Sequence, residues 1–317
     1  MTLAQPATAR HPEAFHGVWP ALLTPLDSRL DIDHPALAAH CQRLLTSGCG
    51  GVTLFGTTGE GTAFSMDERI DTLDRLIAAG VPARHIIVST SCAALPETLA
   101  LTRHAVGAGV HGCLMLPPFF LKGVSDAGII DSYRYVIDGV QQSSLPHALK
   151  LYLYHIPQVS GIALSHHVIG TLKNAYPDIV IGVKDSACTT AQSVALAETF
   201  MDRLAIYVGY EPDLPEMGRH GSQGAISGLA NFMPRLVERL VLQHDAPGTA
   251  AGRARVLELL ALLAPYSLMP ALKGVMAIVT GDPGWLRVRA PLVALSAHEF
   301  AGLTEAMRGF RLDAQTD

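Results

Sequence analysis

Charged and aromatic side chains are scarce in this 317-residue sequence, at 16% and 6% of the residues. Typical soluble proteins have about 25% charged residues. A chain of this size with so little charge often hides part of its surface in an oligomer, and 49% hydrophobic residues can supply a large core. No basic run occurs and the formal net charge is −5. We therefore expect no nucleic-acid partner.

The sequence also lacks paired cysteines and long apolar runs. Its five cysteines show no C-x-x-C spacing, which favours a reducing compartment over a disulfide framework or structural zinc. No apolar run reaches about 18 residues, the length that indicates a membrane span. The start, MTLAQPATARHPEAFHG, lacks the apolar segment of a signal peptide. We expect a flexible tail over residues 1–16, a cytoplasmic location and no membrane partner.

Several catalytic and cofactor motifs are missing as well. The 14 histidines are dispersed without an H-E-x-x-H pair, and no G-x-S-x-G occurs. No G-x-G-x-x-G follows the first apolar segment, which argues against a dinucleotide fold. We expect neither a metal nor a cofactor.

What the sequence does contain is an alternation of short apolar segments and segments with helical periodicity. Eight such pairs predict right-handed βαβ units with a parallel sheet, and their number favours an α/β fold of the (β/α)8 TIM-barrel type. Ser65 and Glu68 have the spacing of a helix capping box. We expect the barrel over 17–245 and a C-terminal helical extension over 246–317. The predicted strands are 17–26, 51–56, 85–91, 112–118, 149–157, 179–185, 204–210 and 224–230.

The carboxyl ends of the strands are where a barrel carries its chemistry. Lys184 ends the segment VIGVKD, on the same face as Val180 and Gly182. If that face points into the barrel, apolar walls favour the neutral, nucleophilic amine, and Gly182 leaves room beside it. For this segment alone, a lysine that simply reaches solvent is the alternative. Tyr154 ends the preceding strand, where its phenol could transfer protons beside the amine or serve only as core packing.

The stretch GTTGEGT, residues 56–62, follows the second predicted strand. Its hydroxyls and its exposed N–H groups suit a carboxylate or a phosphate, although an ordinary glycine-rich turn would look the same.

Taken together, these stretches resemble the dihydrodipicolinate synthase / N-acetylneuraminate lyase family of class I pyruvate-dependent aldolases. The resemblance covers about 17–300 and rests on GTTGE, YHIPQVSG, GVKDS and GSQGAISGLAN, which occur in the family's order. It implies a TIM barrel with C-terminal helices, a lysine Schiff base with pyruvate or another 2-oxo acid, and assembly as a homodimer or homotetramer.

The resemblance also implies catalytic roles. Lys184 matches the Schiff-base lysine, and Tyr154 matches the proton-transferring tyrosine. Thr57 and Thr58 match the pair that binds the pyruvate carboxylate. Thr58 is also expected to adjoin the tyrosine hydroxyl, and we therefore predict a catalytic role for it.

The remaining matched positions concern the substrate pocket. Ile226 would line the pyruvate site with its backbone carbonyl, Gly209 would line the pocket, and His155 replaces the usual asparagine and is expected to bind substrate. In dihydrodipicolinate synthases an arginine that binds aspartate semialdehyde stands where this chain has Val159. A tyrosine donated across the tight dimer stands at the likely counterpart of Phe120. Both departures point to a different second substrate.

We therefore predict an enzyme that condenses pyruvate with an aldehyde, or that cleaves or dehydrates a 2-oxo-3-deoxy (sugar) acid. The alternatives are an authentic dihydrodipicolinate synthase, a non-catalytic paralogue that binds a 2-oxo acid, and an unrelated phosphate-binding barrel enzyme. Cys188, four residues past the lysine, is expected to be a buried small residue.

Overall fold

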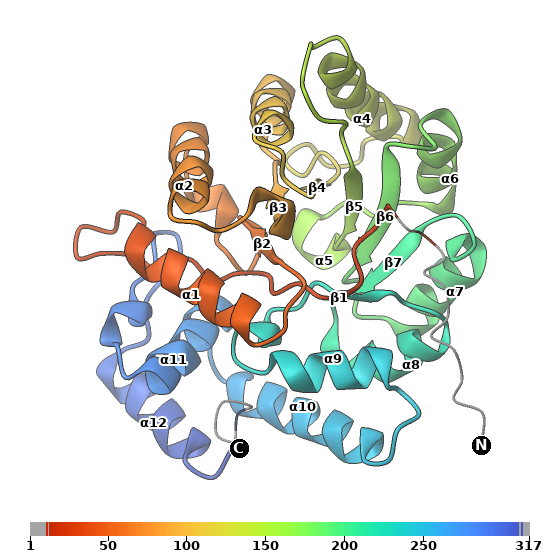
Figure 1. Ribbon diagram of the computed structural model, residues 1–317. Helices are drawn as coiled ribbons and strands as arrows, with labels where there is room; N and C mark the ends of the chain where they lie inside the picture. Colours follow the sequence, from red (N-terminus) through yellow and green to blue (C-terminus); the bar gives the residue numbers. More distant parts are fainter. Residues whose placement is uncertain (1–10, 12, 311, 313–317) are drawn as a thin grey trace.

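A sheet of eight parallel strands forms the centre of the molecule (Figure 1). The computed structural model describes residues 11, 13–310 and 312. The order in the sheet is β1-β8-β7-β6-β5-β4-β3-β2, and a parallel bridge between Ala21 and Thr53 joins the chain after β1 to β2. The strands are β1 (Gly17–Val18), β2 (Val52–Leu54), β3 (Ile86–Ser89), β4 (Gly112–Met115), β5 (Leu151–His155), β6 (Val180–Asp185), β7 (Ala205–Val208) and β8 (Gly224–Ala225).

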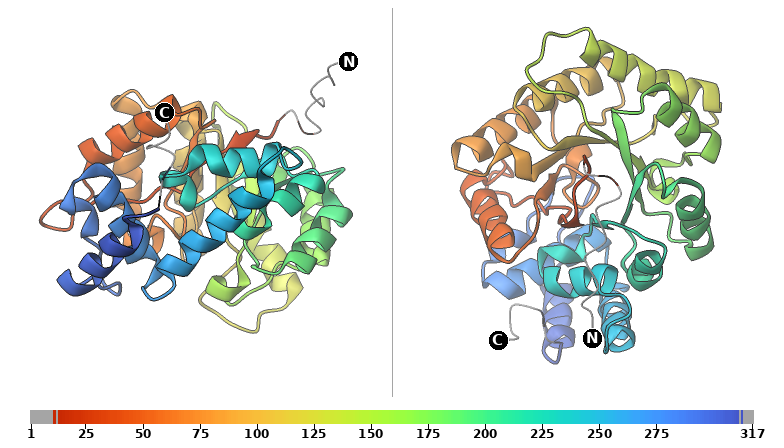
Figure 2. Two further views of the ribbon diagram at one scale, coloured as in Figure 1. Left: turned by 90° about the horizontal axis from the view of Figure 1, so that it is seen from below. Right: turned by 45° about the vertical axis from the view of Figure 1, so that its right-hand side comes forward.

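Every residue of these strands is buried, which explains why they read as continuous apolar runs. Helices cover the outer side of the curled sheet, as two further views show (Figure 2). The strand and helix alternation predicted from the sequence is therefore confirmed. The helices of this ring are α1 (His34–Thr46), α2 (Met66–Ala78), α3 (Leu95–Gly107), α4 (Asp126–Gln141), α6 (His166–Ala175), α7 (Thr190–Phe200), α8 (Leu214–Arg219) and α9 (Pro234–Leu242). The short helix α5 (Pro157–Ser160) lies inside the ring, after β5 (Figure 1).

An aromatic cluster fills the end of the barrel at the amino ends of the strands. Phe15 is 4% exposed and stacks on Tyr207, with ring centroids 3.9 Å apart. The hydroxyl of Tyr207 donates to the carbonyl of Phe15 (2.9 Å). The expected flexible tail over 1–16 is therefore wrong at its end, because Phe15 belongs to this aromatic cluster, which forms the barrel floor. Residues 1–10 and 12 of that tail lie outside the described residues.

After α9 the chain forms α10 (Thr249–Leu263), α11 (Leu268–Thr280) and α12 (Ala297–Met307), the blue helices of Figure 1. Lys273 of α11 is fully buried and forms an ion pair with Glu60, which follows β2. The contact attaches α11 to the carboxyl ends of the strands. The boundary of an extension at residue 246 stays a prediction.

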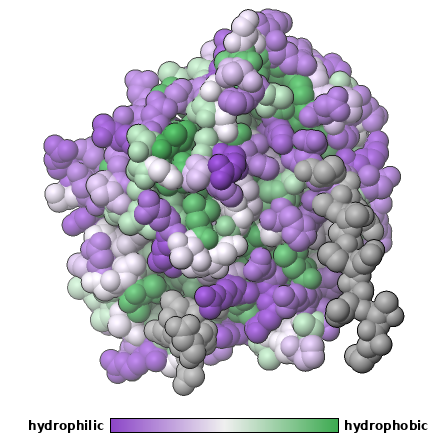
Figure 3. Space-filling model, in the orientation of Figure 1, coloured by the Kyte–Doolittle hydropathy of each residue, from purple (hydrophilic) through white to green (hydrophobic). Residues whose placement is uncertain are grey.

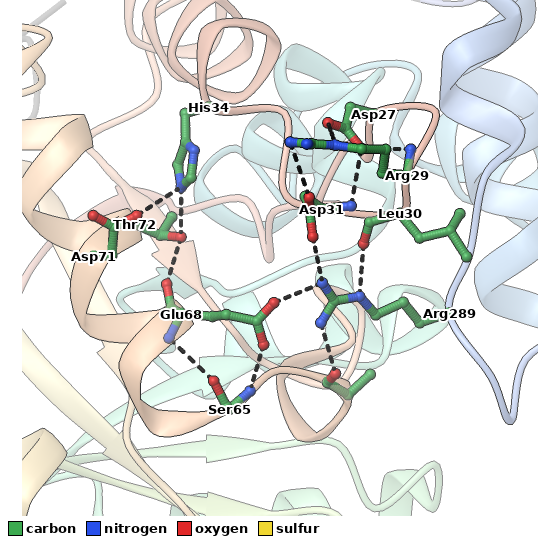
Figure 4. A network of polar contacts seen from close by, with 11 residues as sticks. Asp27, Arg29, Leu30, Asp31, His34, Ser65, Glu68, Asp71, Thr72 and Arg289 are labelled. Carbon is green, nitrogen blue, oxygen red and sulfur yellow. Dashed lines mark hydrogen bonds and ion pairs between the residues drawn. The ribbon is translucent and has the colours of Figure 1, made fainter.

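Arg289 attaches the segment before α12 to the barrel (Figure 4). Its guanidinium donates to the Leu30 carbonyl (2.7 Å) and to the Glu68 carboxylate (2.6 Å). Glu68 also closes the predicted capping box with Ser65, which begins α2. The Glu68 carboxylate thus caps the N-terminus of α2 and also binds the segment before α12.

The face of the molecule seen in Figure 3 is largely polar, with apolar side chains in small separate patches. Among the described residues, no single helix is long and apolar enough to cross a membrane. Only α10 and α11 pass that test together, and they are bent by 109° at their junction.

Candidate active site

Lys184 lies inside the barrel at the end of β6. It is 3% exposed, and its Nζ lies 4.2 Å from the centroid of the Tyr154 ring. The strand register places Lys184 between Tyr154 of β5 and Tyr207 of β7. The surface alternative for this lysine is therefore wrong. Its amine is enclosed by protein and faces a phenol.

Tyr154 connects the lysine to the loop after β2. It is 2% exposed, and its hydroxyl lies 3.3 Å from Oγ1 of Thr57. The expectation that Thr58 adjoins this hydroxyl is wrong in detail, because the structure gives the contact to Thr57. Thr58 lines the same cavity without a hydrogen bond to Tyr154 among the described residues.

The loop that carries the two threonines has an uncommon backbone. Phe55 and Glu60 adopt left-handed conformations, with φ of 58° and 56°. Side chains rarely adopt such values, and they persist where surrounding structure enforces them. A Cβ on Gly61 would lie 1.9 Å from the Phe55 carbonyl oxygen, so the chain doubles back closely here. The glycines of GTTGEG thus allow a fold-back that presents both hydroxyls to the cavity.

Gly209, after β7, makes room for the lysine side chain. A Cβ there would lie 1.9 Å from Oγ of Ser186 and 3.0 Å from Cε of Lys184. The expectation that Gly182 makes this room is wrong, because a Cβ on Gly182 would meet the rings of Tyr152 and Tyr207 instead. Ile226 follows β8 in the same cavity and is 1% exposed.

A cavity of about 360 Å³ opens from these residues. A second cavity of about 350 Å³, on the β2 to β4 side, shares Thr57, Val159 and Met269 with it. The lining residues of the first cavity are Thr57, Thr58, Tyr154, Ile156, Gln158, Val159, Lys184, Ser186, Cys188, Gly209, Tyr210, Glu211, Ile226, Gly228, Leu229, Leu260, Leu268, Met269 and Leu272.

His155 is not among the residues that line this cavity. It follows Tyr154 on the strand, and successive side chains of a strand point to opposite faces. Its Nδ1 lies 3.3 Å from Oδ1 of Asp185, which likewise follows Lys184. The other oxygen of that carboxylate accepts from Ser193 of α7. The expected substrate contact of His155 is therefore not what the geometry shows. The residue lies beside Asp185 of β6, behind the site.

The exposure of two further residues bears on the predictions. Cys188 is exposed, has a φ of 56° and lines the cavity, so the expectation of a buried small residue is wrong. Partial desolvation of its thiol raises the pKa of Cys188, with nearby Glu211 and Asp185 acting in the same direction. Phe120 is 75% exposed and is not part of the cavity lining.

Sequence reasoning did not identify the contribution of α11. Leu268, Met269 and Leu272 line the cavity from a helix far along the chain. Their spacing on α11 was visible as helical periodicity, but nothing local indicates which strand ends they would cover.

Among the described residues, no group of three or more His, Cys, Asp or Glu side chains could hold a metal ion. The functional groups at the strand ends are an amine, a phenol and hydroxyls.

Fold and site together define the class of protein, a barrel enzyme with lyase activity that carries a lysine and a tyrosine inside the barrel. More particularly, the chain belongs to the dihydrodipicolinate synthetase family, whose model matches residues 14–308. The predicted family is thereby confirmed.

Individual relatives agree with this assignment. An uncharacterized DapA-like lyase of Chloroflexus aurantiacus is 34% identical, over 92% of this chain and 95% of the relative. A 4-hydroxy-tetrahydrodipicolinate synthase of Methanococcoides burtonii is 30% identical, over 89% of this chain and 94% of the relative. The crystal structure of dihydrodipicolinate synthase from Agrobacterium tumefaciens superposes with a TM-score of 0.85 at 34% identity, covering 96% of this chain and 100% of that one.

Proposed function

We propose that this protein is a Schiff-base lyase that acts on pyruvate or another 2-oxo acid. The observation that carries the proposal is the enclosed Lys184 amine, which faces the Tyr154 ring at 4.2 Å and opens on a cavity. Few side chains other than lysine can form an imine with a ketone.

The reaction begins with attack of the Lys184 amine on the C2 ketone, followed by loss of water to give an imine. The protonated imine withdraws electrons, so a proton leaves C3 and an enamine forms. The enamine carbon then bonds to an aldehyde, or the reverse step cleaves a 4-hydroxy-2-oxo acid. Loss of a hydroxyl from a 2-oxo-3-deoxy acid is the dehydratase form of the same chemistry.

The neighbouring hydroxyls have separate roles in this proposal. Tyr154 transfers protons to and from the carbinolamine, because its hydroxyl is held by Thr57 beside the amine. Thr57 and Thr58 bind the carboxylate of the 2-oxo acid from the β2 loop, together with backbone N–H groups. Gly209 and the Ile226 carbonyl shape the remaining space.

Authentic dihydrodipicolinate synthase activity is the second candidate. The names of the Methanococcoides and Agrobacterium relatives favour it. Val159, where the family resemblance expects an arginine, opposes it, because valine cannot bind a carboxylate bidentately. A non-catalytic paralogue is disfavoured, since binding alone would not require both the amine and the phenol.

Borohydride trapping tests the imine directly. Incubation with pyruvate and sodium borohydride should add one reduced pyruvate to the intact protein, and peptide mass spectrometry should place it on Lys184. Lys184→Ala should give no adduct. A matched control, Lys150→Ala, removes a lysine that lies outside the cavity and should leave the adduct unchanged. An unmodified Lys184 after exposure to pyruvate and a panel of 2-oxo acids would refute the proposal.

We further propose a homodimer or homotetramer in a cytoplasmic setting. Phe120 and Leu121, after β4, are 75% and 68% exposed, as side chains of an interface would be in an isolated chain. Light scattering on the purified protein measures the assembly, and a monomer at micromolar concentration would contradict it.

A further inference from the structure

The cavity around Lys184 has two chemically different parts. Its base carries the amine, the phenol and the two threonine hydroxyls that the proposed function assigns to the 2-oxo acid. The opposite wall, from the segment after β5 and from α5, α10 and α11, is apolar. The side chains of this apolar wall are Ile156, Val159, Leu260, Leu268, Met269 and Leu272.

Positive charge is absent from the wall. Among the described residues that line the cavity, Lys184 is the only lysine and no arginine occurs. A carboxylate or phosphate buried there would lose its hydration without a cation to replace it. A second substrate with its own anionic group is therefore disfavoured.

Two polar side chains next to the wall, Glu211 and Gln158, already make hydrogen bonds within the protein. Oε1 of Glu211 accepts from Ser227 Oγ (2.7 Å) and from the Leu229 backbone N–H (3.2 Å). The amide of Gln158 donates to the Ser186 carbonyl (2.6 Å) and to Sγ of Cys188 (3.2 Å). Each hydroxyl of a polyol that packs against the carbon of the apolar wall without a hydrogen bond would cost free energy.

We infer that the second substrate is an aldehyde with an apolar substituent, an aryl or alkyl group that packs against the apolar wall. This inference rests on the proposed function and names the class of the aldehyde that reacts with the enamine. Burial of apolar surface gains free energy in proportion to the area removed from water, and Val159 and Leu268 of the wall, 56% and 50% exposed, offer such area. At about 360 Å³ the cavity is near the lower end of small-molecule sites, which range from about 300 to 1,000 Å³.

The reaction balances without a redox partner. The enamine C3 of the pyruvate adduct forms a bond to the aldehyde carbon, and the aldehyde oxygen takes up a proton to become a hydroxyl. Water then hydrolyses the imine and releases the Lys184 amine. The net change is pyruvate plus an aldehyde giving a 4-hydroxy-2-oxo acid with the apolar group on C4.

A comparison of three aldehydes, each supplied separately, tests the inference. Pyruvate is supplied with benzaldehyde, glyceraldehyde or succinic semialdehyde, which carry an aryl group, hydroxyls and a carboxylate. Product formation followed by mass spectrometry gives kcat/KM for each. We expect benzaldehyde to exceed both others by at least about ten-fold, the discrimination that apolar pockets provide. An equal or higher value for either polar aldehyde would overturn the inference.

Variants separate pocket chemistry from the inherent reactivity of the aldehydes. Val159→Arg places a cation on the wall at a residue that is 56% exposed, so the fold should tolerate it. It should lower the ratio of kcat/KM for benzaldehyde to kcat/KM for succinic semialdehyde by about ten-fold or more. The same substitution at Val293, which is 80% exposed and outside the cavity, should leave the ratio unchanged. An unchanged ratio in Val159→Arg contradicts the inference.

Borohydride trapping distinguishes the two possible failures. A trapped pyruvate on Lys184 combined with no turnover of benzaldehyde, or with a preference for a polar aldehyde, rejects the inference and leaves the proposed function standing. Absence of the trapped adduct rejects the proposed function itself.

Discussion

At the scale of single residues, the site depends on which positions carry no side chain as much as on which do. Lys184, Tyr154 and Thr57 supply the functional groups, and Gly209 supplies the volume that the lysine chain occupies. The motifs indicated these functional groups as candidates, and the structure brings them together. They did not indicate that Gly209 is the glycine that serves Lys184, because that depends on the distance between two strands that are separate in the sequence.

Replacing Gly209 by alanine should displace the lysine. The new Cβ would lie 1.9 Å from Ser186 Oγ and 3.0 Å from Lys184 Cε, so one or both must move. A shift of about 1 Å in a reacting group can cost on the order of 100-fold in rate. We expect a loss of about that size in kcat/KM, with slower borohydride trapping by pyruvate.

The control is Gly128→Ala in α4, where the nearest atom, Ser125 Oγ, would be 3.8 Å from the new Cβ. This variant should keep full activity. A Gly209→Ala enzyme with unchanged kcat/KM and unchanged trapping rate would show that the close approach does not position the amine.

At the scale of elements, the β2 loop and α11 are coupled through one buried ion pair. Glu60 ends the strained fold-back that carries Thr57 and Thr58, and Lys273 belongs to the helix whose Met269 and Leu272 line the cavity. Lys273 also donates to the Arg287 carbonyl (2.7 Å). Burial lowers the pKa of Lys273, and the nearby Glu60 carboxylate opposes that shift. The pair thus joins the loop that carries Thr57 and Thr58 to α11.

Removing one partner of this ion pair should lower the free energy of unfolding more than removing both partners. Lys273→Met leaves a buried carboxylate unpaired, which typically destabilises a fold by about 3–5 kcal/mol. Adding Glu60→Gln removes the unpaired charge, so the double variant should recover part of the loss. Denaturation of the single and double variants gives the coupling energy, and the pyruvate KM of the double variant reports the position of the threonine loop.

We expect the KM of the double variant to rise while borohydride trapping on Lys184 still occurs. Strictly additive losses of stability would contradict the coupling. A KM equal to that of the parent would show that the pair stabilises the fold without positioning the loop.

At the scale of the whole molecule, the barrel is joined where β1 meets β8 by a polar centre on Asn231. Its Oδ1 accepts from the Leu23 N–H (3.1 Å) and from His40 Nε2 (2.9 Å), while its Nδ2 donates to the Ala21 carbonyl (2.8 Å). Arg43 lies 3.0 Å from His40 Nδ1, which must accept because the guanidinium can only donate. His40 is therefore held neutral, and burial lowers its pKa to about 3.

This histidine should make stability depend on pH. An unfolded histidine takes up a proton near pH 6.5, whereas folded His40 does so only near pH 3. Between these values the unfolded state binds more protons, so the free energy of unfolding falls as the pH falls, by up to about 1.4 kcal/mol per pH unit from this group. Urea denaturation of the parent and of His40→Gln between pH 7 and pH 4.5 measures the effect.

The glutamine variant should be less stable at pH 7 and should show a shallower decline toward acid. His111, whose pKa burial lowers to about 4, will retain part of the slope in both proteins. His298→Gln, at an exposed position of α12, serves as the control and should follow the parent. Parallel curves for the parent and His40→Gln would refute the assignment.

The sequence by itself determined the eight strands, the capping box and the family. These depend on local patterns: apolar runs, helical periodicity, and short motifs in a fixed order. Only the tertiary structure decided that Thr57 rather than Thr58 meets Tyr154, that His155 faces Asp185 instead of the cavity, and that Phe15 closes the barrel floor. It also decided that α11 covers the site. The physical reason is that these contacts join residues on separate elements, where the curvature of the sheet and the direction of each side chain set the distance.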